Sequence, residues 1–190
     1  MTAVPLAERM TATEFLALPA PAHLLRRELV DGEVVVNEPR PLHQRVLMDL
    51  AFALESWTRA DPSRGEVTLP LDVQLDDRNV FAPDVLFYAG DRGPGRSEVV
   101  PSPMPDLAVE VRSPSTWRYD IGVKKAVYER RGLHELWLVD TAADEVLVFR
   151  RSEAVAPTFD VALEVGRDQH LASPLLPGFA LALAELFPER

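Results

Sequence analysis

Apolar and polar residues alternate along several stretches of the chain, and this pattern is typical of β-strands whose two faces meet different surroundings. In one stretch Leu107, Val109 and Val111 share one face, while Glu110 lies on the other. Pro114 follows and ends the stretch, because proline cannot donate a hydrogen bond to a neighbouring strand. Similar patterns predict two strands within residues 26–36 and further strands at residues 67–75, 80–88, 135–139, 145–150 and 159–165.

Helical spacing of apolar residues recurs in a longer stretch. Val46, Leu50 and Leu54 lie four residues apart and predict the buried face of a helix. This helix is expected to run from Leu42 to the Asp61-Pro62 pair, because the residue before a proline disfavours helical geometry.

Other local signals complete the order of elements. A second long helix is predicted to begin near Asp120 and to end at Gly132, which suits a C-terminal cap. Thr11 and Glu14 fit a capping box that opens a short helix, and Asp31-Gly32 predicts a tight hairpin. The chain is therefore predicted to be α/β, with an N-terminal helix and hairpin and extra C-terminal strands.

Composition narrows the possible chemistry. The 190 residues, 47% of them apolar and 26% charged, suffice for one globular domain, which we expect to span residues 1–190. The sequence has no cysteine, which excludes disulfides, thiolate metal sites and a cysteine nucleophile. It has no run of about 20 apolar residues that could span a bilayer and no apolar leader, so we expect a cytoplasmic protein without a membrane partner.

The net charge of -10 disfavours a protein that coats nucleic acid, although basic residues gather in one segment. Between Val111 and Arg131, six basic side chains outnumber two acidic ones. Such a segment is either a solvated helix face or the positive rim of a cleft that handles phosphate.

Carboxylates in the predicted strands suggest a metal site. In a chain without thiols, the simplest catalyst for phosphodiester hydrolysis is a divalent cation held by carboxylates, with a lysine nearby. Asp84 and Glu110 can supply the carboxylates from one face of neighbouring strands, and the carbonyl of Val111 a further oxygen. Mg²⁺, or Mn²⁺ in its place, is the expected cofactor.

Lys124 is the candidate lysine. It shares a helix face with Asp120 and Tyr128, which are expected to hold it in place, whereas Lys125 is turned about 100° away. The alternative interpretation is that Lys124 only pairs with Asp120 across one helical turn.

Each carboxylate also has a structural interpretation. Glu110 lies in an apolar strand and must be buried, paired or functional, and Arg112 is a possible partner. Asp84 follows Pro83 and could form a turn, but the apolar residues on both sides favour a continuous strand.

Many short motifs occur in the order found in one protein family. They are Glu28 to Glu33, His43, Pro83-Asp84-Val85, Glu110-Val111, Ser113 to Thr116, Asp120, Lys124, Tyr128, Gly132, Glu135, Trp137 and Asp140. Together they resemble the Uma-type restriction-endonuclease-like family, a large bacterial group of domains of unknown function in the PD-(D/E)XK nuclease superfamily. The resemblance extends from about Thr11 to the tail around Phe179.

The resemblance implies a restriction-endonuclease-like mixed β-sheet flanked by helices, with Mg²⁺ as cofactor and Pro83-Asp84 and Glu110 as the acidic motif. The motif has its lysine two residues after the second acid, where this chain has Arg112. An arginine stays protonated and cannot act as a base. The resemblance therefore implies that the lysine has moved to the helix, as Lys124.

Two further residues are secondary candidates. A lone histidine at the start of a helix usually caps or packs, but the resemblance places His43 near the active-site cleft. Glu28, in the preceding hairpin, is a candidate for one more carboxylate.

Three functions remain open at this point. The leading prediction is a metal-dependent DNA endonuclease, a hydrolase that acts as a homodimer and, because of its acidic charge, with a targeting partner protein. The second is a non-catalytic module that keeps the nuclease fold and binds nucleic acid or protein. The third is a metal-dependent hydrolase of a smaller substrate.

Overall fold

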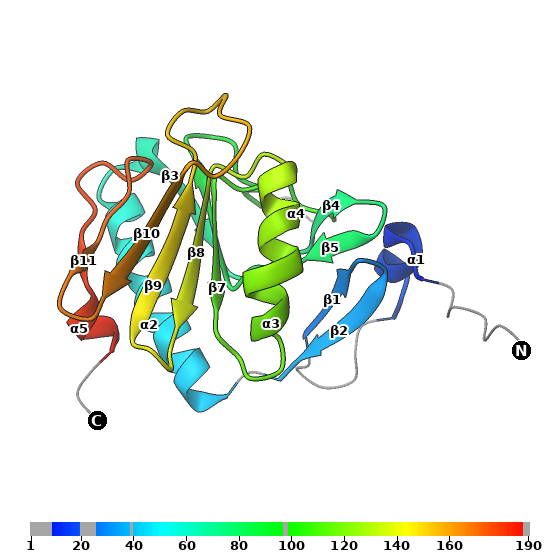
Figure 1. The fold of residues 1–190 in the computed structure, drawn as a ribbon. Helices are drawn as coiled ribbons and strands as arrows, with labels where there is room; N and C mark the ends of the chain where they lie inside the picture. Colours follow the sequence, from blue (N-terminus) through cyan, green and yellow to red (C-terminus); the bar gives the residue numbers. More distant parts are fainter. Residues whose placement is uncertain (1–8, 20–25, 39, 97–98, 188–190) are drawn as a thin grey trace, which may run out of the picture.

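The computed structural model describes residues 9–19, 26–38, 40–96 and 99–187, which form a large sheet, two smaller sheets and several helices (Figure 1). The large sheet is mixed, because one parallel strand pair lies among antiparallel neighbours. Its strands follow the order β10 (Val161–Gly166), β9 (Glu145–Arg150), β8 (Glu135–Asp140), β7 (Leu107–Val111), β6 (Val85–Ala89) and β3 (Gly65–Thr68). The parallel pair is β7 and β8.

A four-stranded antiparallel sheet stands beside the large one in Figure 1. Its order is β2 (Glu33–Asn37), β1 (Arg26–Val30), β5 (Asn79–Phe81) and β4 (Val73–Asp76). The predicted hairpin is confirmed: β1 and β2 are joined by Asp31 and Gly32, whose φ angles of 50° and 76° suit a two-residue turn. A short sheet of β11 (His170–Leu171) and β12 (Leu181–Ala182) lies near the C-terminal end.

The two long helices cover opposite faces of the large sheet. The short helix α1 (Ala12–Leu16) has the predicted capping box, and α2 (Pro41–Arg59) is the predicted long helix. The second long helix consists of α3 (Trp117–Tyr119), a π-helical turn η2 (Asp120–Lys124) and α4 (Lys125–Arg130). A 3₁₀ turn, η1 (Pro62–Arg64), follows α2, and α5 (Leu183–Leu186) closes the described chain. None of the described helices is long and apolar enough to cross a membrane.

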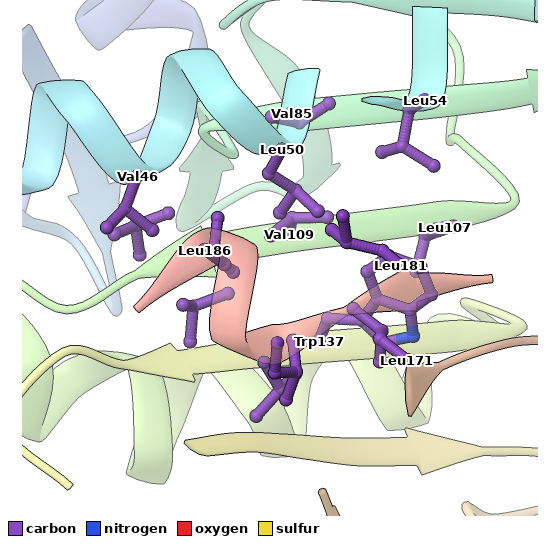
Figure 2. Packing of buried hydrophobic residues seen from close by; sticks show 14 of the residues in the cluster. Val46, Leu50, Leu54, Val85, Leu107, Val109, Trp137, Leu171, Leu181 and Leu186 are labelled. Carbon is purple, nitrogen blue, oxygen red and sulfur yellow. The ribbon is translucent and has the colours of Figure 1, made fainter. Parts of the chain in front are cut away.

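Two apolar layers fix which way each strand residue points. On one face Leu50 of α2 packs toward Val85, Val109 and Trp137 of the sheet (Figure 2). The opposite face packs against α4, and its cluster includes Leu86, Ala108, Val127, Tyr128 and Leu136. Alternation along β7 therefore sends Val109 toward α2 and Glu110 toward α4.

Two of the predicted strands are wrong, because each is divided between the two larger sheets. Residues 67–75 form β3 and β4, with Pro70 in the gap between them. Residues 80–88 form β5 and β6, and Asp84 lies in the bend between them rather than in a continuous strand. In both places a proline removes a backbone donor, and the chain leaves one sheet for the other.

The second long helix also begins earlier than predicted, at Trp117 instead of near Asp120. Its predicted end is confirmed, since Gly132 follows the last turn with a φ of 87°.

Candidate active site

Four buried carboxylates from separate segments gather where the four-stranded sheet, the large sheet and the second long helix meet. They are Glu28 of β1, Asp84 before β6, Glu110 of β7 and Asp120 of η2. Each side chain is at most 6% exposed, which requires charged or hydrogen-bonding partners. The partners divide the cluster into an Asp84 half and a Lys124 half.

In the Asp84 half, one carboxylate accepts hydrogen bonds from three groups. Oδ1 accepts from Nη1 and Nη2 of Arg26, both at 2.9 Å. Oδ2 accepts from the backbone N–H of Val111 at 2.7 Å and lies 3.2 Å from Nε2 of His43. Burial alone would raise the pKa of Asp84, but His43, Arg26 and the Val111 amide together hold this pKa below its ordinary value.

His43 comes from the first turn of α2 and is 2% exposed. An ionised carboxylate can only accept, so the proton between the two groups lies on Nε2 of the imidazole. His43 therefore lies beside Asp84, and its role in the site stays a prediction.

In the Lys124 half, one ammonium lies among three carboxylates. Nζ of Lys124 is 2.7 Å from Oε1 of Glu110, 2.9 Å from Oε1 of Glu28 and 3.0 Å from Oδ1 of Asp120. The interpretation that Lys124 only pairs with Asp120 is therefore wrong. The π-helical turn spans residues 120–124, and such turns are frequent at functional sites.

The charges in this half shift the pKa values of its members. Burial would lower the pKa of Lys124, but Asp120, Glu110 and Glu28 raise it well above its ordinary value, so the side chain stays a cation. Burial and the neighbouring carboxylates raise the pKa of Glu110 and of Asp120, against the opposing effect of Lys124. The single ammonium does not compensate all three carboxylates.

Tyr128 and Glu28 tie this half to its surroundings. The hydroxyl of Tyr128 donates to Oε1 of Glu110 at 2.8 Å, so Tyr128 positions Glu110 directly rather than Lys124. Glu28 also accepts the backbone N–H of Ala82 at 2.8 Å. Through this bond Glu28 fixes the segment that leads to Asp84.

Arg112 lies outside the cluster. Its Nη1 donates to both carboxylate oxygens of Asp140 at 2.8 Å, and its guanidinium lies over the ring of Trp117. The suggested pairing of Arg112 with Glu110 is wrong, because the guanidinium of Arg112 pairs with Asp140 instead. The residue at the position that carries lysine in the simple motif therefore forms an ion pair outside the cluster in this chain.

The donor set of the cluster fits a divalent metal ion in its chemistry. Asp84 immediately precedes Val85, which pairs with Val109, so Asp84 and Glu110 are neighbours where β6 begins and the antiparallel β7 ends. The four carboxylates are contacted by two permanent cations, Lys124 and Arg26, which leaves an excess of anionic oxygen ligands. Among the described residues, however, no three acidic or histidine side chains form a ready-made metal cage.

One residue of the cluster was missed by the sequence analysis. Arg26 contacts Asp84 twice and also donates to the carbonyl of Ala82 at 2.9 Å. It lies two residues before Glu28 on β1, so strand alternation puts both on one face. That spacing was the signal that could have identified it.

Comparison with known proteins places this chain in a family. A family model described as "Putative restriction endonuclease", Uma2, matches residues 12–184. A crystal structure titled as a "putative nuclease belonging to DUF820" from Anabaena variabilis superimposes with a TM-score of 0.77 at 19% identity, covering 94% of this chain and 97% of that one. The fold is thus the restriction-endonuclease-like fold. No curated protein matches the sequence.

Proposed function

We propose, from the premise that this chain belongs to the Uma2 family of restriction-endonuclease-like proteins, that it is a metal-dependent endonuclease that hydrolyses phosphodiester bonds. The observation that carries the proposal is the convergence of Asp84, Glu110 and Lys124. Three segments distant in sequence bring two adjacent carboxylates and a buried ammonium to one place. This combination supplies both ligands for a cation and a fixed positive charge for an anionic transition state.

The proposed cofactor is Mg²⁺ or Mn²⁺, held by Asp84 and Glu110 with the Val111 carbonyl as a further ligand. When bound, such an ion supplies Lewis acidity and lowers the pKa of water. The protein holds Glu110 through the Tyr128 hydroxyl and Asp84 through the Val111 amide, so both carboxylates are oriented in advance.

Lys124 is proposed to stabilise negative charge on the phosphoryl oxygens. Its raised pKa keeps it protonated at neutral pH, so it acts as a fixed positive charge rather than as a general base. Glu28 and Asp120 hold the ammonium in position at 2.9 and 3.0 Å.

DNA is the proposed substrate. The net charge of -10 works against tight sequence-independent binding, because affinity for nucleic acid rests mainly on neutralising phosphates. We therefore propose that a targeting partner protein brings this domain to its DNA.

Cleavage of both strands of a duplex suggests two copies of the chain, and the exposed side of α2 offers a face for a second copy. Met48 and Phe52 are 62% and 74% exposed there and border an apolar groove of about 390 Å³. A two-fold axis between them would put Arg45 of one copy opposite Glu55 of the other. Sedimentation velocity should show a dimer for the wild type and a monomer for Phe52→Asp; a monomeric wild type would contradict this.

One observation favours a second candidate function, a non-catalytic binding module with the nuclease fold. Both oxygens of Asp84 already accept hydrogen bonds from Arg26, His43 and the Val111 amide. A carboxylate satisfied in this way can serve as a structural element instead of a metal ligand.

A plasmid-nicking assay separates the two functions. Supercoiled DNA is incubated with Mg²⁺ or Mn²⁺ and with the wild type, Glu110→Gln or Glu135→Gln. Glu135 is an equally buried glutamate at the far end of β8, bonded to Trp137 and Ser173 instead of the cluster. We expect nicking by the wild type and by Glu135→Gln, about a hundredfold less nicking by Glu110→Gln, and no nicking with a chelator. Equal nicking by all three proteins would indicate a contaminant.

A further inference from the structure

Arg26 occupies the oxygen of Asp84 that a metal ion would need. Both terminal nitrogens of its guanidinium donate to Oδ1 at 2.9 Å, and one of them also donates to the Ala82 carbonyl at 2.9 Å. The other oxygen, Oδ2, is taken by the Val111 amide and by His43. Asp84 therefore has to give up a donor before it can bind a cation.

Of these donors, Arg26 is the one that can leave most easily. Its side chain is 24% exposed, whereas that of His43 is 2% exposed and the Val111 amide is fixed in the strand. A divalent cation at Asp84 would also repel the guanidinium, since both carry positive charge at short range.

The guanidinium also has an unused donor. Among the described residues, Nε of Arg26 is buried and has no hydrogen-bond partner. Planar guanidinium groups bind phosphate through two parallel hydrogen bonds, and a phosphodiester would supply acceptors for such a fork.

We propose that Arg26 is a substrate-binding residue that shields Asp84 in the metal-free protein and transfers to a DNA phosphate when a divalent cation binds. This proposal rests on the proposed nuclease function, because it assumes a cation at Asp84. It adds a residue to the site and assigns it two successive partners, a carboxylate and a phosphate.

Arg27 provides a matched control. It is the next residue on β1, so its side chain projects from the opposite face, and it donates to the Pro19 carbonyl at 2.7 Å. Arg26→Gln and Arg27→Gln change the net charge equally, but only the first uncovers Asp84.

The first measurement is Mn²⁺ binding to the full chain by isothermal titration calorimetry without DNA. Arg26→Gln is expected to bind Mn²⁺ at least roughly threefold more tightly than the wild type, because a competing cation is removed. Arg27→Gln and Arg26→Lys are expected to stay close to the wild type, the latter because it keeps the charge. Circular dichroism melts of each variant confirm that it is folded.

The second measurement is binding of a short DNA duplex in Ca²⁺, at several salt concentrations. Arg26→Gln should bind at least roughly threefold more weakly than Arg27→Gln, and its slope of log affinity against log salt should be smaller by about one phosphate contact. A structural role for Arg26 alone would leave this slope unchanged.

The outcomes separate this proposal from the function on which it rests. A wild type that binds no Mn²⁺ overturns the metal-dependent function, and the role of Arg26 with it. A wild type that binds Mn²⁺ as tightly as Arg26→Gln, or more tightly, overturns only the shielding of Asp84. Tighter Mn²⁺ binding by Arg26→Gln with unchanged DNA binding overturns the transfer to phosphate.

Discussion

The two halves of the buried cluster have opposite electrostatic character, although their carboxylates are neighbours. Asp84 is surrounded by donors, namely Arg26, His43 and a backbone amide, and its pKa is lowered. In the other half, three carboxylates share the ammonium of Lys124, and the pKa of Glu110 is raised. Burial is nearly equal in both, so the partners, not the degree of burial, decide the sign of the shift.

The difference suggests a division of tasks. The Asp84 half is already satisfied and fixes one carboxylate in place. The Lys124 half carries the surplus of negative charge, which is what a divalent cation would compensate. A metal between Asp84 and Glu110 would thus take one pre-oriented ligand from the Asp84 half and most of its electrostatic attraction from the Lys124 half.

The largest effect is expected for Lys124→Met. It leaves three buried carboxylates without their cation, which costs about 3–5 kcal/mol of unfolding free energy. Lys125→Met is the control: the ammonium of Lys125 lies over the half-buried ring of Phe149, and its loss should cost less than about 1 kcal/mol. Urea denaturation measures both free energies of unfolding. Equal losses of stability would show that Lys124 does not hold the three carboxylates together.

The next largest effect is the difference in lost stability between Asp84→Asn and Asp120→Asn. Asp84→Asn places an amide against the donors of Arg26 and Val111 and should cost about 3 kcal/mol. Asp120→Asn removes one of three mutually repelling carboxylates and should cost less than about 1 kcal/mol. Urea denaturation without metal at neutral pH compares them. Similar costs would remove the distinction between the halves.

A smaller effect is expected for Tyr128→Phe. The change deletes the hydroxyl that donates to Oε1 of Glu110 but keeps the edge-to-face contact with Phe81, so about 1 kcal/mol of stability is lost. Because the hydroxyl orients Glu110, Mn²⁺ affinity measured by calorimetry should also fall. An unchanged affinity would show that Glu110 is positioned by other contacts.

The smallest effect concerns pH. The folded-state pKa of Asp120 is raised, so its contribution to stability is present below the ordinary value of 3.8 and is lost as pH rises through the raised value. The unfolding free energy of the wild type relative to Asp120→Asn should therefore fall as pH increases from about 4 toward neutrality. Urea titrations at a series of pH values test this, and a rise would mean that Asp120 is stabilised as an anion.

Much of this site could be predicted from the periodicity of the sequence. Alternation in residues 107–111 puts Glu110 opposite to the apolar core face, and helical spacing puts Lys124 on one face with Asp120. The turn chemistry of Asp31-Gly32 sets the register of the hairpin that brings Glu28 to the cluster.

Other features depend on contacts that no local pattern records. The apolar residues on both sides of Pro83 suggested one strand. They are apolar because both segments are buried, but the first segment belongs to the four-stranded sheet and the second to the large sheet. Arg112 pairs with Asp140, 28 positions away, and Arg26 reaches Asp84 across 58 positions. Periodicity gives the face of a side chain but not its partner, so these pairings became visible only in the fold.

Binding of Mn²⁺ tests the central claim most directly, because it requires no DNA substrate. Calorimetry on the wild type, Asp84→Asn, Glu110→Gln and the control Glu135→Gln compares the two halves in one experiment. We predict one Mn²⁺ per wild-type chain, at least about tenfold weaker binding for the first two variants, and unchanged binding for Glu135→Gln. Wild-type affinity in either Asp84→Asn or Glu110→Gln would contradict a metal shared between the two halves.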